Sequence, residues 1–441
     1  MRPNGELLPL LRLALPLIAV QVGIQSISLV STILAGRISA VALGATGLGA
    51  GIFFAIGLLG VGIVTGVDPI ASQAFGAHRP RTARRALWHG IYIAMLVTLP
   101  LSFLILGVLH GLGTFGVRPE LAVATREYVY GRLPSLFPFL AFTASRIYLQ
   151  AAHRTRPILA SVLVANVINF LATWILVFAG PRLGIFGLGL GSTLATLYMM
   201  IHAALAIRAI PPGPGTEPLH PLDGILFRQV FRLGLPIGFQ IFAEAAIFTL
   251  VGILAGTLGT EAMASHQVAL TLASFTFMVP LAIGFATSVQ VGRAIGRGDA
   301  TGTKGAGMAG IRLGGGFMLV AAGIMWLFPE TLARALSSDS SVVFLAVTLI
   351  RIAAAFQIFD GVQAVASGAL RGAGVTRWAM VVNLIAYWLI ALPVGTALMF
   401  GKGLGVLGLW WGLTAGLAVA AVALTTKFVL ASRRPIAALQ P

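Results

Sequence analysis

The stretch RLALPLIAVQVGIQSISLVSTILAG, residues 12–36, decides the fold because it carries no charge after Arg12. At 1.5 Å per residue, a helix of this length crosses a hydrocarbon core of about 30 Å. Apolar runs of similar length recur along nearly the whole chain, and the alternating pattern of a membrane barrel is absent. A spanning helix satisfies its own backbone hydrogen bonds where water is missing. The sequence therefore predicts an all-α membrane protein.

Composition agrees with this prediction and excludes several classes of function. Of the 441 residues, 58% are hydrophobic and 9% are charged, whereas soluble domains have roughly 25% charged residues. The net charge of +17 arises from basic residues that stand singly between apolar runs, so no nucleic-acid partner is expected. The chain has no cysteine and no phosphate-binding loop, HExxH or GxSxG motif. We expect neither an enzyme nor a cofactor other than a coupling ion, H⁺ or Na⁺.

The apolar runs predict twelve transmembrane helices in two groups of six. The segment PPGPGTEPLHPLD, residues 211–223, is rich in proline and charge and cannot cross a bilayer. We expect an N-terminal lobe over 1–207, a cytoplasmic linker over 208–228, a C-terminal lobe over 229–431 and a tail over 432–441. The spans are predicted near 9–34, 43–70, 86–110, 122–147, 157–179, 184–207, 229–256, 262–291, 305–328, 342–368, 377–400 and 404–430.

The two lobes are related by an internal repeat. A shift of 220 residues superposes RLALPL at 12–17 on RLGLPI at 232–237, and LGIFGLGLG at 183–191 matches LGVLGLWWG at 404–412 at an offset of 221. Because each half has an even number of spans, we expect a pseudo-twofold axis along the membrane normal and a cavity between the lobes. Pro16 and Pro236 occupy equivalent positions and are candidate hinges.

Basic residues predict the orientation. Lys and Arg concentrate in the loops on the side of both termini, including HRPRTARR at 78–85 and RAIGRGDATGTK at 293–304. Cytoplasmic loops carry this excess. We expect both termini in the cytoplasm, an inner (plasma) membrane location, and a monomer whose partners are the lipid bilayer and small molecules.

Two acids lie deep inside predicted spans, Glu244 in PIGFQIFAEAAIF and Asp360 in AAFQIFDGVQ. Charge in hydrocarbon is costly, so such acids are functional candidates. A low-dielectric environment disfavours an ionised carboxyl, which lets it load and release a proton; a pair can alternatively ligate Na⁺. We expect Glu244 and Asp360 to bind the coupling ion. A structural role, with the acids satisfied by polar neighbours, is the alternative.

Other polar and aromatic residues inside spans are candidates for the substrate cavity. Each has a simpler interpretation: Arg351 can snorkel, His266 can bond a carbonyl, asparagines can join helices, and aromatic residues can face lipid. Asp68 stands near the cytoplasmic end of a span, where an interfacial role is favoured. The cavity candidates are Asn166, Asn169, Phe248, His266, Gln267, Arg351, Phe356, Asn383 and Tyr387.

The motifs ILAGRISAVALGATGLG, RLGLPIGFQIFAEAAIF, LGTEAMASHQVAL, FQIFDGVQAVASGALRG and NLIAYWLIALPVG resemble the MATE (multidrug and toxic compound extrusion) family, in its NorM-like branch, along essentially the whole chain. The resemblance implies twelve helices in two lobes and cation-coupled antiport of organic cations and lipophilic drugs. It assigns the cation site to Glu244 and Asp360.

Two departures from the family pattern bear on coupling. Many bacterial members have V-D-T in the first span, whereas this chain has Val30-Ser31-Thr32, so the carboxylate of a first-lobe site is missing. Members with a sodium site have a tyrosine where this chain has Phe356. Fewer hard oxygen ligands shift our expectation from Na⁺ to H⁺, and a Na⁺-coupled multidrug antiporter is the nearest alternative. A lipid-linked oligosaccharide flippase and a structural or receptor membrane protein are more distant alternatives.

Overall fold

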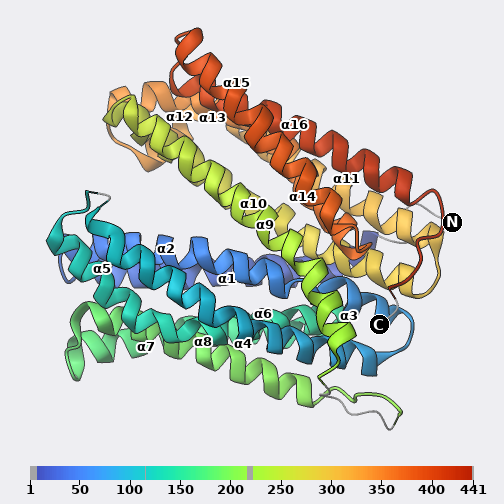
Figure 1. Cartoon of the computed structure of the whole chain (residues 1–441). Helices are drawn as coiled ribbons and strands as arrows, with labels where there is room; N and C mark the ends of the chain where they lie inside the picture. The colour runs from blue at the N-terminus through green and yellow to red at the C-terminus, as the bar shows by residue number, and fades with distance from the viewer. Residues whose placement is uncertain (1–6, 115, 216–221, 440–441) are drawn as a thin grey trace. The chain divides into compact units, whose positions relative to one another are not determined.

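The computed structural model describes residues 7–114, 116–215 and 222–439 (Figure 1). In these ranges the regular structure is helical and no strand occurs. Within the described ranges, eleven helical segments are long and apolar enough to cross a membrane. These findings confirm the prediction of an all-α membrane protein.

The chain divides into two compact units. The N-terminal unit comprises Ala19–Phe242, and the C-terminal unit comprises Ala243–Leu439 together with the chain up to Ile18. The helices α1 (Leu7–Gly36) and α9 (Gly224–Thr257) each contribute to both units. Both contain an internal proline, Pro16 in α1 and Pro236 in α9. Their role as hinges stays a prediction.

In the N-terminal unit, α8 packs against α5, α6 and α7, and α2 packs against α4 and α5. The Ser39 side chain caps α2 by accepting a hydrogen bond from the N–H of Ala42, which fixes the first turn. The elements of this unit are α2 (Ala40–Val64), α3 (Val67–Gly76), α4 (Pro80–His110), η1 (Gly111–Gly113), α5 (Pro119–Arg132), η2 (Leu133–Ser135), α6 (Leu136–Ala151), α7 (Thr155–Trp174), η3 (Ile175–Ala179) and α8 (Gly184–Arg208).

The span predicted near 122–147 is two helices and not one. The 3₁₀ turn η2 separates α5 from α6, and it contains Pro134, which has no N–H for a helical hydrogen bond. Neither helix qualifies alone as a membrane span, because α5 has 14 residues, four of them charged, and α6 has only 16 residues. The eleven candidate spans therefore lack this one of the twelve that were predicted.

In the C-terminal unit, α13 is central and runs beside α10, α11 and α16 (Figure 1). Asp299 and Asp339 cap α11 and α13 by accepting backbone N–H hydrogen bonds. The elements are α10 (Thr260–Gly296), α11 (Ala300–Leu327), α12 (Pro329–Leu336), α13 (Ser340–Gly372), α14 (Thr376–Leu384), the π-helix η4 (Ile385–Ala391), α15 (Leu392–Thr396), the π-helix η5 (Ala397–Gly401) and α16 (Val406–Ala431).

Small residues bring α13 close to α10. A Cβ atom on Gly368 would lie 2.3 Å from the carbonyl oxygen of Gly284, and one on Gly372 would lie 2.2 Å from that of Ser288. Only residues without a Cβ allow this approach. The contact fixes α13, and with it the depth of Asp360, against the rest of the unit.

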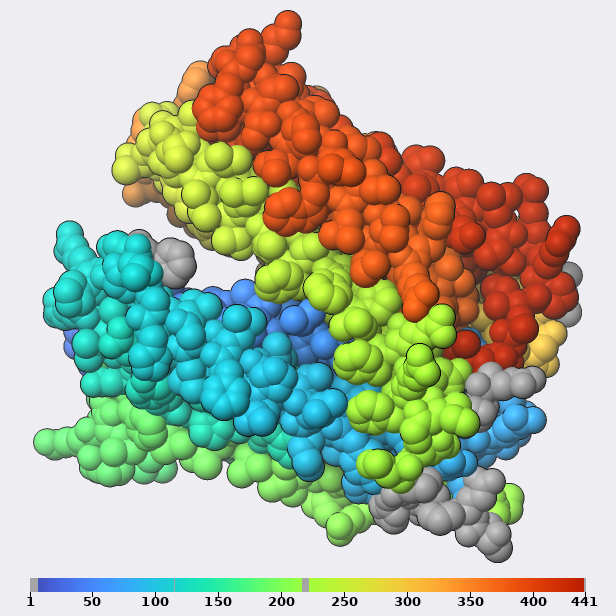
Figure 2. Space-filling view, viewed as in Figure 1, coloured from blue at the N-terminus to red at the C-terminus, as the bar shows by residue number. Residues whose placement is uncertain are grey.

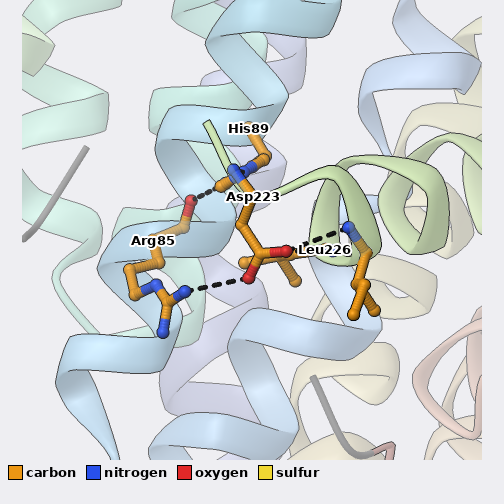
Figure 3. A network of polar contacts seen from close by, with 5 residues as sticks. Arg85, His89, Asp223 and Leu226 are labelled. Atoms are coloured by element: carbon orange, nitrogen blue, oxygen red, sulfur yellow. Dashed lines mark hydrogen bonds and ion pairs between the residues drawn. The ribbon is translucent and has the colours of Figure 1, made fainter. Parts of the chain in front are cut away.

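Arg85 and His89 hold the start of α9 to α4 (Figure 3). The Arg85 guanidinium donates to a carboxylate oxygen of Asp223 at 2.9 Å, and the other oxygen accepts the N–H groups of Ile225 and Leu226. The backbone N–H of Asp223 donates to Nε2 of His89 at 3.1 Å. Helix α9 therefore starts at Gly224, earlier than the predicted 229, because Asp223 caps it.

Large apolar side chains are exposed on the outer helices, as expected where lipid replaces water. On α4 the exposed fractions are 61% for Met95, 63% for Leu99 and 65% for Phe103. Part of the α4 surface is visible in Figure 2. Exposure of this extent on a soluble domain would mark an interaction site.

Candidate functional site

Glu244 and Asp360 belong to the same unit, as the sequence predicts. Glu244 lies on α9 and is partly exposed, whereas Asp360 lies on α13 and is 5% exposed. The two carboxyl groups are close enough for their charges to interact. Tyr387 on η4 is buried and donates its hydroxyl hydrogen bond to Oε1 of Glu244 at 3.2 Å. Three helical segments thus bring two carboxyls and one phenol together.

The internal repeat relates Tyr387 to a residue of the first half. At the offset of 221 that relates the LGIFGLGLG and LGVLGLWWG motifs, its equivalent in the first half is Asn166. The Asn166 amide donates to the carbonyl oxygen of Gly23 on α1 at 2.8 Å. At the offset of 220, Gly23 is equivalent to Ala243, the neighbour of Glu244. Both units therefore form a polar bond at this interhelical position, but only the C-terminal unit uses a carboxyl.

An aromatic cluster includes Tyr387, the partner of Glu244. The Phe248 ring centroid lies 6.1 Å from that of Phe356 and 6.3 Å from that of Tyr387, both in edge arrangements. Phe356 in turn contacts Trp410 at 5.5 Å. Such rings supply a low-dielectric wall and faces that attract cations. The sequence predicted three of these rings as cavity residues, those of Phe248, Phe356 and Tyr387. It did not predict Trp410, because tryptophans in an apolar span are common packing residues.

His266 joins this cluster at its edge. The Trp410 indole N–H donates to His266 Nδ1 at 3.2 Å, and the imidazole is 1% exposed. Its other nitrogen, Nε2, is buried without a partner among the described residues. Gln267 is exposed on the neighbouring position of α10, and Arg351 is exposed on α13. The structure thus gives neither of these two a place in the cluster.

Asn383 lies beside the second of two buried glutamines on α13. Gln363 donates to Asn383 Oδ1 at 2.7 Å, and Asn383 donates to the carbonyl oxygen of Ala379 at 2.8 Å. Gln357 lies on the other side of Asp360 and is fully buried. Neither glutamine was singled out from the sequence, although their spacing of three residues on each side of Asp360 in FQIFDGVQ was the available signal.

The N-terminal unit has a neutral polar cluster at the place of the missing carboxylate. Asn169 donates to the carbonyl oxygen of Ile27 at 3.1 Å and to Ser31 Oγ at 3.3 Å. Ser31 Oγ lies 3.2 Å from Ser192 Oγ. Asn169 and Ser192 are completely buried. The amides of Asn166 and Asn169 thus donate to backbone carbonyls of α1. These bonds fit a role in joining helices.

Among the described residues, no group of three or more His, Asp or Glu side chains gathers to hold a metal ion. The C-terminal site offers two carboxyls and one hydroxyl. Asp68 is buried in the first turn of α3, where a carboxylate interacts favourably with the helix dipole. The interfacial role of Asp68 stays a prediction.

Comparisons with known proteins find similarity to one family over nearly the whole chain. The family model MatE matches residues 16–175 and 236–396. A protein of Bradyrhizobium diazoefficiens called probable multidrug resistance protein NorM is 35% identical over 97% of this chain and 94% of its own length. The multidrug resistance protein NorM of Aliivibrio fischeri is 29% identical over 98% and 96%. The solved structure of the eukaryotic MATE transporter AtDTX14 is similar with a TM-score of 0.89 at 23% identity, covering 97% and 96%.

Proposed function

The chain belongs to the MatE family, and we propose that it is a proton-coupled antiporter that exports organic cations and other lipophilic compounds from the cytoplasm. The relatives named NorM support multidrug efflux. The observation that carries the choice of site is the electrostatically interacting pair of Glu244 and Asp360 in one unit. The transporter works by binding and release and not by bond chemistry.

The carboxyl pair can couple two ligands because both compete for the same negative charge. Two ionised carboxylates close together in a low-dielectric site repel each other, so binding either protons or a cationic substrate lowers their free energy. Tyr387 holds Glu244 in place through its hydroxyl. Proton loading from outside would release the substrate, and deprotonation toward the cytoplasm would recruit the next one.

A Na⁺-coupled antiporter with the same acids is the second candidate. Na⁺ requires several hard oxygen ligands, and the phenyl ring at position 356 supplies none. The hydroxyl that is hydrogen-bonded to the pair is that of Tyr387, which donates to Glu244. This donor set favours the proton.

The orientation with both termini in the cytoplasm rests on the distribution of Arg and Lys. In this orientation the contact of Arg85 with Asp223 lies on the cytoplasmic side. An inner membrane location and a monomeric state complete the proposal.

Transport in proteoliposomes tests this function. Vesicles containing the purified protein are loaded with ethidium, and its movement is followed under an imposed pH gradient or an imposed Na⁺ gradient. We expect the pH gradient alone to drive transport. Transport driven only by Na⁺ would favour the second candidate, and no transport under either gradient would contradict drug antiport and favour a flippase.

A further inference from the structure

Two buried glutamines flank Asp360 on α13, one three residues before it and one three residues after it. Gln357 is 0% exposed and Gln363 is 2% exposed. Residues three apart on a helix are neighbours on its surface. The carboxyl of Asp360 makes no hydrogen bond to a described residue. Gln357 and Gln363 are the polar residues within one turn of it on α13.

A backbone carbonyl fixes the orientation of Gln363. The Asn383 amide NH₂ donates to the Ala379 carbonyl oxygen, so the Asn383 side-chain oxygen must be an acceptor. It accepts the NH₂ of Gln363 at 2.7 Å. The Gln363 Oε1 atom is consequently turned away from Asn383, and it is buried without a hydrogen-bond partner among the described residues.

The orientation of Gln357 is fixed in a similar way from α10 and α11. The Thr276 hydroxyl donates to backbone carbonyls one turn earlier in α10 at 3.0 Å, so its oxygen accepts the NH₂ of Gln357. The same NH₂ lies 3.6 Å from the sulfur of Met325, which is only an acceptor. The Gln357 Oε1 atom is also buried, and no residue in the described ranges donates to it.

Two buried carbonyl oxygens without donors carry an energetic cost that a hydrogen-bond donor would remove. An ionised carboxylate accepts only, whereas a protonated carboxyl has one O–H donor. We propose that Gln357 and Gln363 are positioning residues that recognise the protonated form of Asp360, accepting its O–H directly or through one water. The inference rests on the proposed proton coupling. It names the residues that favour the state in which Asp360 carries a proton.

The other groups near Asp360 and its flanking glutamines are two titratable residues and two uncharged ones. The titratable neighbours of Asp360 are Glu244 on α9 and Tyr387 on η4. The groups from α10 and α11 that reach Gln357 are Thr276 and Met325, which are uncharged. Loss of the proton sets a carboxylate beside carbonyl oxygens, which repel it and favour a rearrangement.

The test replaces each glutamine by the similarly long methionine, in Gln357→Met and Gln363→Met. The initial rate of ethidium transport in proteoliposomes is measured over a pH series at a constant pH gradient. Each replacement removes an acceptor for the protonated acid, so the pH midpoint should move to lower pH by roughly half to one unit.

Gln290→Met is the matched control. Gln290 is a buried glutamine of the same unit near the cytoplasmic end of α10, and its unpaired atom is a donor, Nε2. Its midpoint should stay at the wild-type value. A third variant, Thr276→Val, releases the Gln357 amide with little change in volume and should also lower the midpoint.

An unchanged midpoint in the folded variants, or an equal shift in Gln290→Met, overturns the inference. If Gln357→Met does not fold, the Thr276→Val result decides for Gln357 in the same way, and Gln363→Met remains the test for Gln363. Absence of proton-driven transport in the wild type would instead contradict the proposed function, so the two failures are distinguishable.

Discussion

The hydroxyl of Tyr387 donates a hydrogen bond to Oε1 of Glu244 across 3.2 Å and joins η4 to α9. The bond replaces the asparagine-to-backbone bond of the first half, from Asn166 to Gly23. One repeat position thus serves packing in one unit and holds a carboxyl in the other.

Replacing Tyr387 by phenylalanine should slow proton-driven transport while the fold persists. The ring contact with Phe248 is retained, and the lost hydrogen bond is worth about 1 kcal/mol, or roughly a fivefold change in rate. The measurement is the initial rate of ethidium transport. Tyr198→Phe on α8, where the ring stacks on His202, is the control; equal rates in wild type and Tyr387→Phe would contradict a positioning role.

Asn169 should prove structural. In Asn169→Leu the hydrogen bonds to Ile27 and Ser31 are lost, which should lower the free energy of unfolding by about 1–3 kcal/mol. The expected result is a lower melting temperature in detergent with an unchanged KM for the exported cation. Ser26→Ala, at a half-buried position of α1 where the hydroxyl bonds only its own helix, should leave both values unchanged. A raised KM without loss of stability would mean that Asn169 binds substrate.

Asp223 should stabilise the start of α9 both as a cap and as an ion-pair partner. Asp223→Ala should cost about 1 kcal/mol of stability, and Asp223→Asn, which keeps the capping oxygen, should cost less. Melting temperatures of the two variants in detergent measure the difference. Identical losses would show that the cap contributes nothing beyond the pair with Arg85.

The same residue gives a pH dependence. Burial raises the pKa of Asp223, but the N–H groups of Leu226 and Ile225 and the Arg85 guanidinium outweigh it, so the pKa is lowered overall. A lowered pKa in the folded state means that the stabilisation is present above about pH 4 and is lost as the pH falls through the folded value. The gap in melting temperature between wild type and Asp223→Asn should therefore be constant from pH 5 to 8 and should shrink below about pH 4. A gap that widens on acidification would contradict this account.

Close packing of α9 against α2 should tolerate no side chain at Gly234. A Cβ atom there would lie 1.8 Å from the carbonyl oxygen of Ile63, which is backbone and cannot move aside cheaply. Gly234→Ala should abolish the folded protein, as seen by size-exclusion chromatography. Gly47→Ala, at a position of α2 with no atom within 4 Å, should behave as wild type.

The periodic signals in the sequence predicted most of the fold. Apolar length located the spans to within a few residues, and the cost of charge in hydrocarbon singled out Glu244 and Asp360. The break at Pro134 was missed because the apolar run continues through it. Gln357 and Gln363 were missed because uncharged amides in spans are common helix-joining groups; only the unpaired oxygens in the folded chain distinguish them. Arg351 is exposed on α13, and its role in the cavity stays a prediction, because depth in the sequence does not show which face a residue occupies.

The most direct test of the central claim is proton movement caused by substrate. Proteoliposomes with a trapped pH-sensitive dye receive a pulse of ethidium without any imposed gradient, for wild type, Glu244→Gln and Asp360→Asn. We predict that wild type moves protons opposite to ethidium and that each neutralised variant moves none. Ethidium transport without proton movement in the wild type, or unchanged proton movement in both variants, would contradict the carboxyl-pair antiporter.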